Sequence, residues 1–434
     1  MSLTLLGVVG IIVLFIFIFL NVPVGFSLAG IGILGVCLTR GLDSGLNILG
    51  VEYYRTASTY VFSVVPLFIG MGFVASHADL SRQAFKVIRN FIGHRRGGLA
   101  MASTMACSVF AAICGDSIAT ATTIGSVSLP EMRRYNYKDT LSLGCVAAGG
   151  NLGFLIPPSL GFIFYAILTE QSVGILFISG ILPGVLLTVL FLIAIWIWCL
   201  VDKNVAPVSD RVGWGERLRS MYKIIGSLVL ILLILGGIYL GFFTPTEAGA
   251  VGLFGVLLVG IVTGSLTLDG FIRAMFDTAV LVGRIFILIT GAIVFGRFIT
   301  FTEIPPNLAQ AIVDANLSPY LVLCIVLGFY VLIGFVMDIM SIILLAAPIL
   351  HPILVQLGFD PVWLAAATMV TVLMGNISPP VGIVVYAMSG FVEDANVFTI
   401  FRGTFPFLGM MLIGLILMII FPQIALFLPS LMSP

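Results

Sequence analysis

The sequence predicts an all-α integral membrane protein of about ten transmembrane helices with two re-entrant hairpins, arranged as an inverted repeat. Hydrophobic residues make up 60% of the 434-residue chain and charged residues only 9%, whereas about 25% of a typical soluble protein is charged. Apolar runs close to the ~20 residues that span a bilayer recur along the chain. A single spacing of 222 residues also relates landmarks of the first half to landmarks of the second.

Apolar runs that are long enough to cross a bilayer follow one another along the whole chain. The uninterrupted runs are 3–20, 22–39, 60–78, 174–201, 222–241, 248–265, 276–300 and 405–430. Two further apolar segments, 139–169 and 361–390, are broken by Gly, Asn and paired prolines, and they bring the total to about ten spans. No Lys or Arg precedes the first run, so we expect it to stay as a helix rather than to act as a signal peptide.

Charge and cysteine content argue against several other classes of protein. The net charge is zero, and the basic residues are not massed as a nucleic-acid patch requires. The six cysteines fall within apolar segments without CxxC spacing, so neither a disulfide framework nor a zinc site is indicated. No nucleophile with a base, metal-ligand cluster or phosphate loop is visible, and we therefore do not expect an enzyme.

Proline, glycine and aspartate positions predict two repeats. An offset of 222 relates Pro157-Pro158 to Pro379-Pro380, and the same offset relates Asp116 to Asp338, Pro130 to Pro352, Gly153 to Gly375, Pro23 to Pro245 and Gly30 to Gly252. In a chain with 20 prolines, one such match can arise by chance. A whole ordered set of matches at the same offset is not expected by chance. We divide the chain into a first repeat, 1–201, a linker, 202–221, and a second repeat, 222–434.

The distribution of charged residues predicts that the second repeat is inverted in the membrane. The loops around the first interrupted segment carry Arg82, Lys86, Arg89, Arg95, Arg96, Arg133, Arg134 and Lys138. The matching loops, 301–320 and 355–361, carry acidic residues, and no Lys or Arg occurs from 303 to 401. We expect the basic loops and the linker to be cytoplasmic and the acidic loops to lie outside. Inverted repeats with discontinuous helices are typical of secondary transporters.

Segments 98–133 and 320–354 are the predicted re-entrant hairpins. If 98–133 crossed the membrane once, its two basic flanks would lie on opposite sides, which the charge rule disfavours. We expect its turn near 114–117, where Gly permits a reversal and polar side chains can cap the second arm. By the offset, the second hairpin turns near 337–341.

The two hairpin tips and the two broken helices, 139–169 and 361–390, are expected to converge near the bilayer centre. Helix N-termini there suit a carboxylate, while hydroxyls and the carbonyls freed by prolines suit a hard cation such as Na⁺. The candidate substrate- and ion-binding residues are Asp116, Ser117, Thr120, Thr122, Asn151, Gly153, Pro157, Asp338, Ser341, Asn376, Ser378 and Pro379. One Na⁺ site is predicted at Ser117, Asn151 and Gly153, and another at Asp338, Asn376 and Ser378.

Each candidate also has a purely structural interpretation. Asp116 and Asp338 cap hairpin helices, the prolines simply kink their helices, and Thr120 and Thr122 bond carbonyls of the preceding turn. Arg284 and Arg297 snorkel to opposite faces of the membrane instead of neutralising an anion, and we do not assign them to the site. The basic stretch 82–96 is either an interfacial helix that meets anionic membrane lipid or a solvated loop.

Four motifs resemble a known family over essentially the whole chain: AAICGDSIATATTIGSVSLPEM, GNLGFLIPPS, GFFTPTEAGA and GNISPPVG. They are similar to the large, DctM-like membrane subunit of tripartite ATP-independent periplasmic (TRAP) transporters. Asp116 departs from the serine that is common at its position in the family. The resemblance implies an elevator-type, multi-pass subunit of the bacterial inner membrane that couples Na⁺ entry to uptake of an organic acid anion. It also implies a small four-helix membrane subunit of the Q type and a soluble periplasmic substrate-binding protein.

The leading hypothesis is thus the large subunit of a Na⁺-coupled importer for a carboxylated solute, such as a C4-dicarboxylate or a sugar acid like sialic acid. An alternative is a stand-alone Na⁺/anion symporter, or an arsenite-type carrier, that needs no binding protein. A third possibility is an intramembrane enzyme with an Asp116–Asp338 dyad, or a purely structural subunit.

Overall fold

The computed structural model describes residues 2–20, 22–392 and 395–432, and every regular element within these ranges is a helix. The first half holds α1 (Leu3–Phe19), α2 (Val24–Arg40), α3 (Leu42–Ser58), η1 (Tyr60–Ser63), α4 (Val64–His77), α5 (Leu80–Ile92), α6 (Gly98–Cys114), α7 (Ser117–Arg134), α8 (Asp139–Asn151), η2 (Leu152–Phe154), α9 (Leu160–Thr169) and α10 (Val173–Val201). The all-α prediction is confirmed.

The second half is helical in the same way. It holds α11 (Trp214–Tyr239), α12 (Pro245–Val262), α13 (Leu268–Phe301), α14 (Ile304–Asp314), α15 (Pro319–Gly334), α16 (Ile339–Gln356), α17 (Pro361–Asn376), α18 (Ile383–Phe391), α19 (Val397–Ile420) and α20 (Gln423–Ser430). The predicted run 405–430 therefore contains a helix end, because Pro422 lies two residues after the end of α19 and has no N–H to continue its hydrogen bonding.

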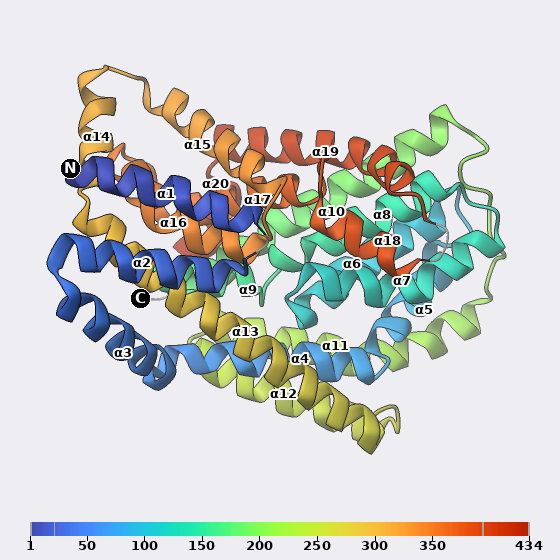
Figure 1. Cartoon of the computed structure of the whole chain (residues 1–434). Helices are drawn as coiled ribbons and strands as arrows, with labels where there is room; N and C mark the ends of the chain where they lie inside the picture. Colours follow the sequence, from blue (N-terminus) through green and yellow to red (C-terminus); the bar gives the residue numbers. More distant parts are fainter. Residues whose placement is uncertain (1, 21, 393–394, 433–434) are drawn as a thin grey trace.

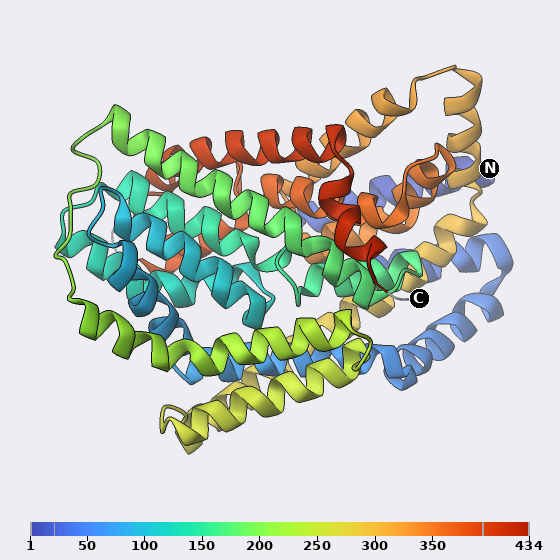
Figure 2. The ribbon, with the colours of Figure 1, turned by 180° about the vertical axis from the view of Figure 1, so that it is seen from behind.

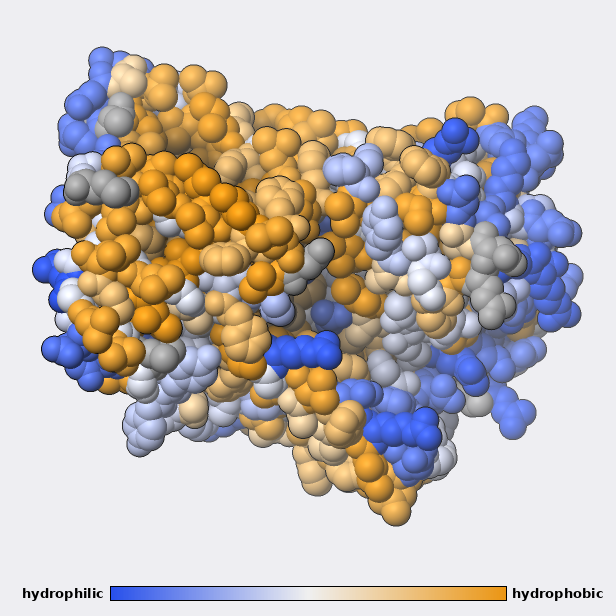
Figure 3. Space-filling view, in the orientation of Figure 1, coloured by the Kyte–Doolittle hydropathy of each residue, from blue (hydrophilic) through white to orange (hydrophobic). Residues whose placement is uncertain are grey.

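Most helices run along the long direction of the molecule (Figure 1). Seen from behind, α10 and α11, in two shades of green, extend along this face (Figure 2). On the face shown in Figure 3, hydrophobic residues cover much of the area between the two ends, and hydrophilic residues gather toward the ends. Among the described residues, six helices are long and apolar enough to cross a membrane, or seven if the bent helix α11 is counted. Further apolar helices, including α1 and α2, are shorter.

Helix bounds follow the offset that was found in the sequence. Helix α16 begins and ends 222 residues after α7, and α17 begins 222 residues after α8. One departure is clear: α13 is a single helix of 34 residues, where the first half has α3, η1 and α4 in sequence. The matching bounds support the two-repeat hypothesis, and the inversion of the second half in the membrane stays a prediction.

The helices pack as two groups. In one group α13 packs against α2, α3 and α4, and α12 packs against α4 and α11. In the other, α6, α7 and α8 pack together, α15 packs on α17, and α19 packs on α8. The groups meet where α4 contacts α6 and where α13 contacts α16, and α5 packs on both α6 and α11. Helix α5 shows that most of the basic stretch 82–96 is helical, while its contact with lipid stays a prediction.

Candidate functional site

The tip of the first hairpin is built from two residues. Helices α6 and α7 pack against each other and are joined by Gly115 and Asp116. Gly115 has a φ of +67°, and a Cβ added there would lie 2.6 Å from the Pro158 carbonyl oxygen, so only glycine fits. Asp116 caps α7, because its Oδ1 accepts a hydrogen bond from the Ala119 N–H at 2.7 Å.

The tip of the second hairpin also has an aspartate cap, but different groups bond to its carboxylate. Asp338 caps α16 by accepting a hydrogen bond from the Ser341 N–H at 3.1 Å. The Ser341 hydroxyl donates to the other carboxylate oxygen of Asp338. Both aspartates therefore act as helix caps, as the structural interpretation predicts.

The first broken helix lies directly against the first tip. Helix α8 ends at Asn151, and the Asn151 carbonyl accepts a hydrogen bond from Ser117 Oγ at 2.9 Å. Gly153 in η2 approaches the tip so closely that an added Cβ would lie 2.4 Å from the Asp116 carbonyl oxygen. Pro157 lies in the non-helical stretch before α9. The predicted trio Ser117, Asn151 and Gly153 is thus brought together, with Ser117 and Asn151 bonded to each other.

The second broken helix has its gap between α17 and α18. Helix α17 ends at Asn376, and Ser378 and Pro379 lie in the stretch before α18 begins. Ser378 Oγ donates to the Met374 carbonyl at 2.6 Å. Of the predicted trio Asp338, Asn376 and Ser378, the serine therefore satisfies its own helix end.

Two asparagines join the broken helices. Asn151 Nδ2 donates to the carbonyl of Leu373 at 2.7 Å, and Leu373 is the residue that follows Asn151 by the repeat offset of 222. Asn376 Nδ2 donates to Asn151 Oδ1 at 3.1 Å. Both side chains are at most 2% exposed. Asn376 Oδ1 is buried and receives no hydrogen bond within the described part of the chain, which leaves an acceptor for a ligand.

The threonines of the first hairpin follow their structural interpretation. Thr120 Oγ1 donates to the Asp116 carbonyl at 2.6 Å, and Thr122 Oγ1 donates to the Ile118 carbonyl at 2.8 Å. Both hydroxyls therefore donate to carbonyls of the preceding turn.

One cavity of about 370 Å³ lies where the two tips meet α13. Four of the candidate residues line it, together with Arg284 and a set of mainly apolar side chains: Asp116, Ser117, Asp338, Asn376, Arg284, Ile118, Phe154, Leu281, Ile285, Leu288, Ile339, Met340 and Ile383. The other eight candidates, all of them described residues, lie outside this lining. The cavity thus brings together four of the twelve candidates and adds one cation from outside the hairpins.

Arg284, which the sequence analysis leaves out of the site, lies in the lining of the cavity. Arg273 pairs with Asp269 at 2.9 Å, and Arg297 pairs with Glu52 at 3.3 Å. Arg284 lines the cavity, and among the described residues it has no ion-pair partner. From the spacing of thirteen residues, Arg284 and Arg297 are expected at opposite faces of the membrane. No pattern in the sequence connects Arg284 with the two hairpins, which belong to the other packing group.

The model of the family "Tripartite ATP-independent periplasmic transporter, DctM component" matches residues 11–424. The chain belongs to this family. It is 34% identical over 386 residues to the C4-dicarboxylate TRAP transporter large permease protein DctM of Pseudomonas aeruginosa, covering 88% of this chain and 89% of that protein. It is 29% identical over 415 residues to the sialic acid TRAP transporter large permease protein SiaM of Vibrio cholerae, covering 95% and 96%.

The fold is also similar to a solved transporter outside these close relatives. The crystal structure of the Alcanivorax borkumensis YdaH transporter matches with a TM-score of 0.64 at 16% identity, over 90% of this chain and 88% of the other. This likeness concerns the fold alone. Together with the apolar helices, family membership makes the chain a multi-pass TRAP permease subunit of the bacterial inner membrane, and the hypothesis of an intramembrane enzyme is set aside.

Proposed function

We propose that this DctM-family subunit imports an organic acid anion together with Na⁺ through the cavity between the two hairpin tips. The observation that carries the proposal is the composition of that cavity, which joins Asp116, Asp338, Arg284 and the unpaired oxygen of Asn376. Carboxylate and amide oxygens are suitable ligands for a hard cation, and a guanidinium is suited to a carboxylate.

The charge of the cavity gives a physical reason why anion binding is coupled to Na⁺ binding. With both carboxylates ionised, the two aspartates and one arginine leave the cavity with a formal charge of −1, which repels an anion in a site of low dielectric. Cations bound at the tips reverse this sign, so each ligand strengthens the binding of the other. A substrate carboxylate then lies between Arg284 and the bound cations.

The packing groups suggest how the site moves. Arg284 lies on α13, which packs with α2, α3 and α4, whereas the tips belong to the other group. In an elevator-type movement, the hairpin group slides against the α13 group and carries the bound solute with it. The proposed partners are a small four-helix Q-type subunit and a soluble periplasmic protein that delivers substrate, as the tripartite description of the family suggests.

Reconstitution tests this function. The chain is placed in liposomes with its small subunit and binding protein, and uptake of labelled succinate and sialic acid is measured with and without an inward Na⁺ gradient. We expect one of these two solutes to be taken up, and its uptake to require all three proteins and Na⁺. Uptake by this chain alone contradicts the tripartite mode, and uptake that ignores Na⁺ contradicts the coupling.

A further inference from the structure

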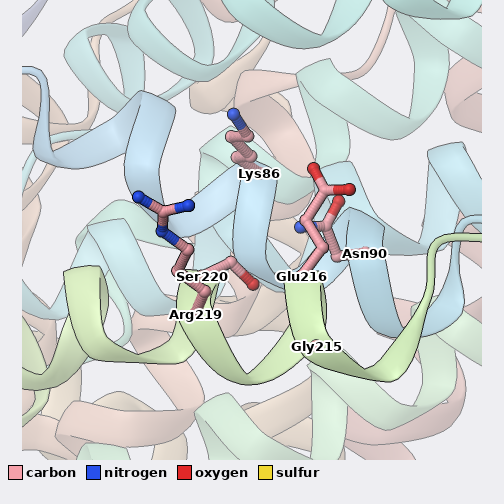
Figure 4. Close-up of a pocket in the computed structure, with 6 residues that line it drawn as sticks. All are labelled: Lys86, Asn90, Gly215, Glu216, Arg219 and Ser220. Carbon is pink, nitrogen blue, oxygen red and sulfur yellow. The ribbon is translucent and has the colours of Figure 1, made fainter.

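We propose that a pocket between α5 and the start of α11 binds the headgroup of phosphatidylethanolamine from the surrounding membrane. This pocket has a volume of about 570 Å³ and is distinct from the cavity between the tips. Helix α5 contributes Lys86 and Asn90, and α11 contributes Gly215, Glu216, Arg219 and Ser220 (Figure 4).

The pocket contains a buried donor that has no partner. Asn90 is 3% exposed, and its Nδ2 makes no hydrogen bond within the described residues. Ser220, 6% exposed, already donates its hydroxyl to the Arg217 carbonyl at 2.7 Å, which leaves its oxygen on the pocket wall. A buried amide donor without a partner is costly, and an acceptor such as a phosphate oxygen satisfies it.

The charges of the pocket suit a phosphate next to an ammonium. The other cations of α5 are engaged, because Arg82 lies 3.7 Å from Asp79 and Arg89 lies 2.8 Å from Glu131. Lys86 and Arg219 line the pocket, and neither has an ion-pair partner among the described residues. Two cations bind a phosphodiester, and the Glu216 carboxylate is placed to accept the ammonium of ethanolamine.

The first two turns of α11 have the exposed apolar face that lipid requires. Trp214, Leu218 and Tyr222 recur every four residues and are 70%, 64% and 79% exposed. Trp and Tyr concentrate at the level of lipid headgroups, and a helix with one basic and one apolar face lies in the membrane interface. Helix α11 bends by 48° just after this segment, which turns the interfacial part away from the spanning part. The acyl chains would cover this face while the headgroup occupies the pocket.

Lipid retention tests the proposal. The chain is co-purified with its small subunit in detergent, delipidated in steps, and the remaining phospholipid is identified by mass spectrometry. We expect phosphatidylethanolamine to persist in the wild type and to fall at least tenfold in Lys86→Gln/Arg219→Gln, because the lipid phosphate then loses both of its charged hydrogen-bond donors. Lys203→Gln/Arg273→Gln removes two exposed cations elsewhere and is expected to keep the lipid.

The ligand assignment is tested by adding back defined probes to the delipidated complex and measuring its unfolding temperature. Phosphatidylethanolamine should raise it more than phosphatidylglycerol, and Glu216→Gln should remove this preference. Equal retention in the two double variants overturns the site. Equal protection by millimolar inorganic phosphate overturns the lipid as its ligand, and so does lipid binding by the isolated chain that disappears when the small subunit is present.

Discussion

The tip of the first hairpin is bonded to the broken helix of its own repeat, whereas the hydrogen bonds described for Asp338 and Ser341 stay within the second tip. The reason is chemical. The residue that corresponds to Ser117 by the offset is Ile339, and the one that corresponds to Asn151 is Leu373. The repeat therefore preserves where helices start and stop. Among the described residues, a side-chain hydrogen bond between the hairpin tip and the broken helix occurs in the first repeat only. Substitutions at equivalent positions should accordingly have unequal effects.

The largest effect is expected at the two asparagines. Asn151→Leu and Asn376→Leu should each lower Na⁺-dependent uptake more than about 100-fold while the protein remains inserted, because a productive site tolerates little misplacement of its ligands. They should differ in stability. Asn151→Leu leaves the Leu373 carbonyl and the Asn376 amide unpaired, at about 1–3 kcal/mol each, whereas Asn376→Leu removes one bond. Uptake and unfolding temperature in detergent are the two measurements.

Asn307→Leu is the matched control for both asparagines, since Asn307 is exposed on α14. It should leave uptake and stability close to wild type. Normal uptake by both Asn151→Leu and Asn376→Leu would contradict the assignment of these asparagines to the site.

The contact between Gly153 and the first tip predicts the next largest effect. In Gly153→Ala the new Cβ meets the Asp116 carbonyl oxygen at 2.4 Å, and backbone cannot yield as a side chain does, so about 1–3 kcal/mol of overpacking is expected. We expect at least a tenfold loss of uptake and a lower unfolding temperature. Gly390→Ala on α18 meets no atom within 4 Å and should behave as wild type; equal behaviour of the two variants contradicts the close contact.

Replacing the two capping aspartates by serine distinguishes a role in helix capping from a role in ion binding. Asp116→Ser and Asp338→Ser keep a side-chain oxygen that caps the helix, so stability should change by less than about 1 kcal/mol. Both remove a carboxylate from the cavity, and we expect the Na⁺ concentration for half-maximal uptake to rise about tenfold, roughly 1.4 kcal/mol. If that concentration is unchanged in both variants, the aspartates are caps alone.

The two serines of the tips are compared by stability alone. Ser117→Ala leaves the buried Asn151 carbonyl without its partner, which costs about 1–3 kcal/mol. Ser341→Ala keeps the backbone N–H that bonds Asp338 and should cost about 1 kcal/mol or less. Thermal unfolding of the two variants under identical conditions gives the comparison, and a larger loss for Ser341→Ala is incompatible with a more firmly bonded first tip.

The sequence predicted the parts of this structure that depend on local chemistry. Gly115 before a capping Asp116, and the prolines after Asn151 and Asn376, set where helices end, because these residues act through their own backbone. The offset of 222 extended the same reasoning to the second half. Helix bounds at α7 and α16 agree with it at both ends.

Contacts between distant elements were not predictable in this way. Arg284 lines the cavity because α13 packs against α16 of the second hairpin, and no periodicity within α13 predicts that contact. The two predicted Na⁺ sites stay predictions. The sequence did not indicate that Ser378 would bond its own helix end or that the Asn151 amide would donate to the opposite repeat. Which oxygen remains unpaired depends on tertiary packing.

Uptake by the Arg284→Gln variant, measured in the reconstituted tripartite system over a range of Na⁺ concentrations, tests most directly whether the two packing groups form one site. Arg273→Gln, which removes an exposed cation from the same helix, is the control. We expect Arg284→Gln to lower uptake of the organic anion about 10- to 100-fold at every Na⁺ concentration, because the substrate carboxylate loses a charged hydrogen-bond donor worth about 1.5–3 kcal/mol, with Arg273→Gln unchanged. Uptake by Arg284→Gln equal to that of the control would contradict a shared cavity for anion and Na⁺.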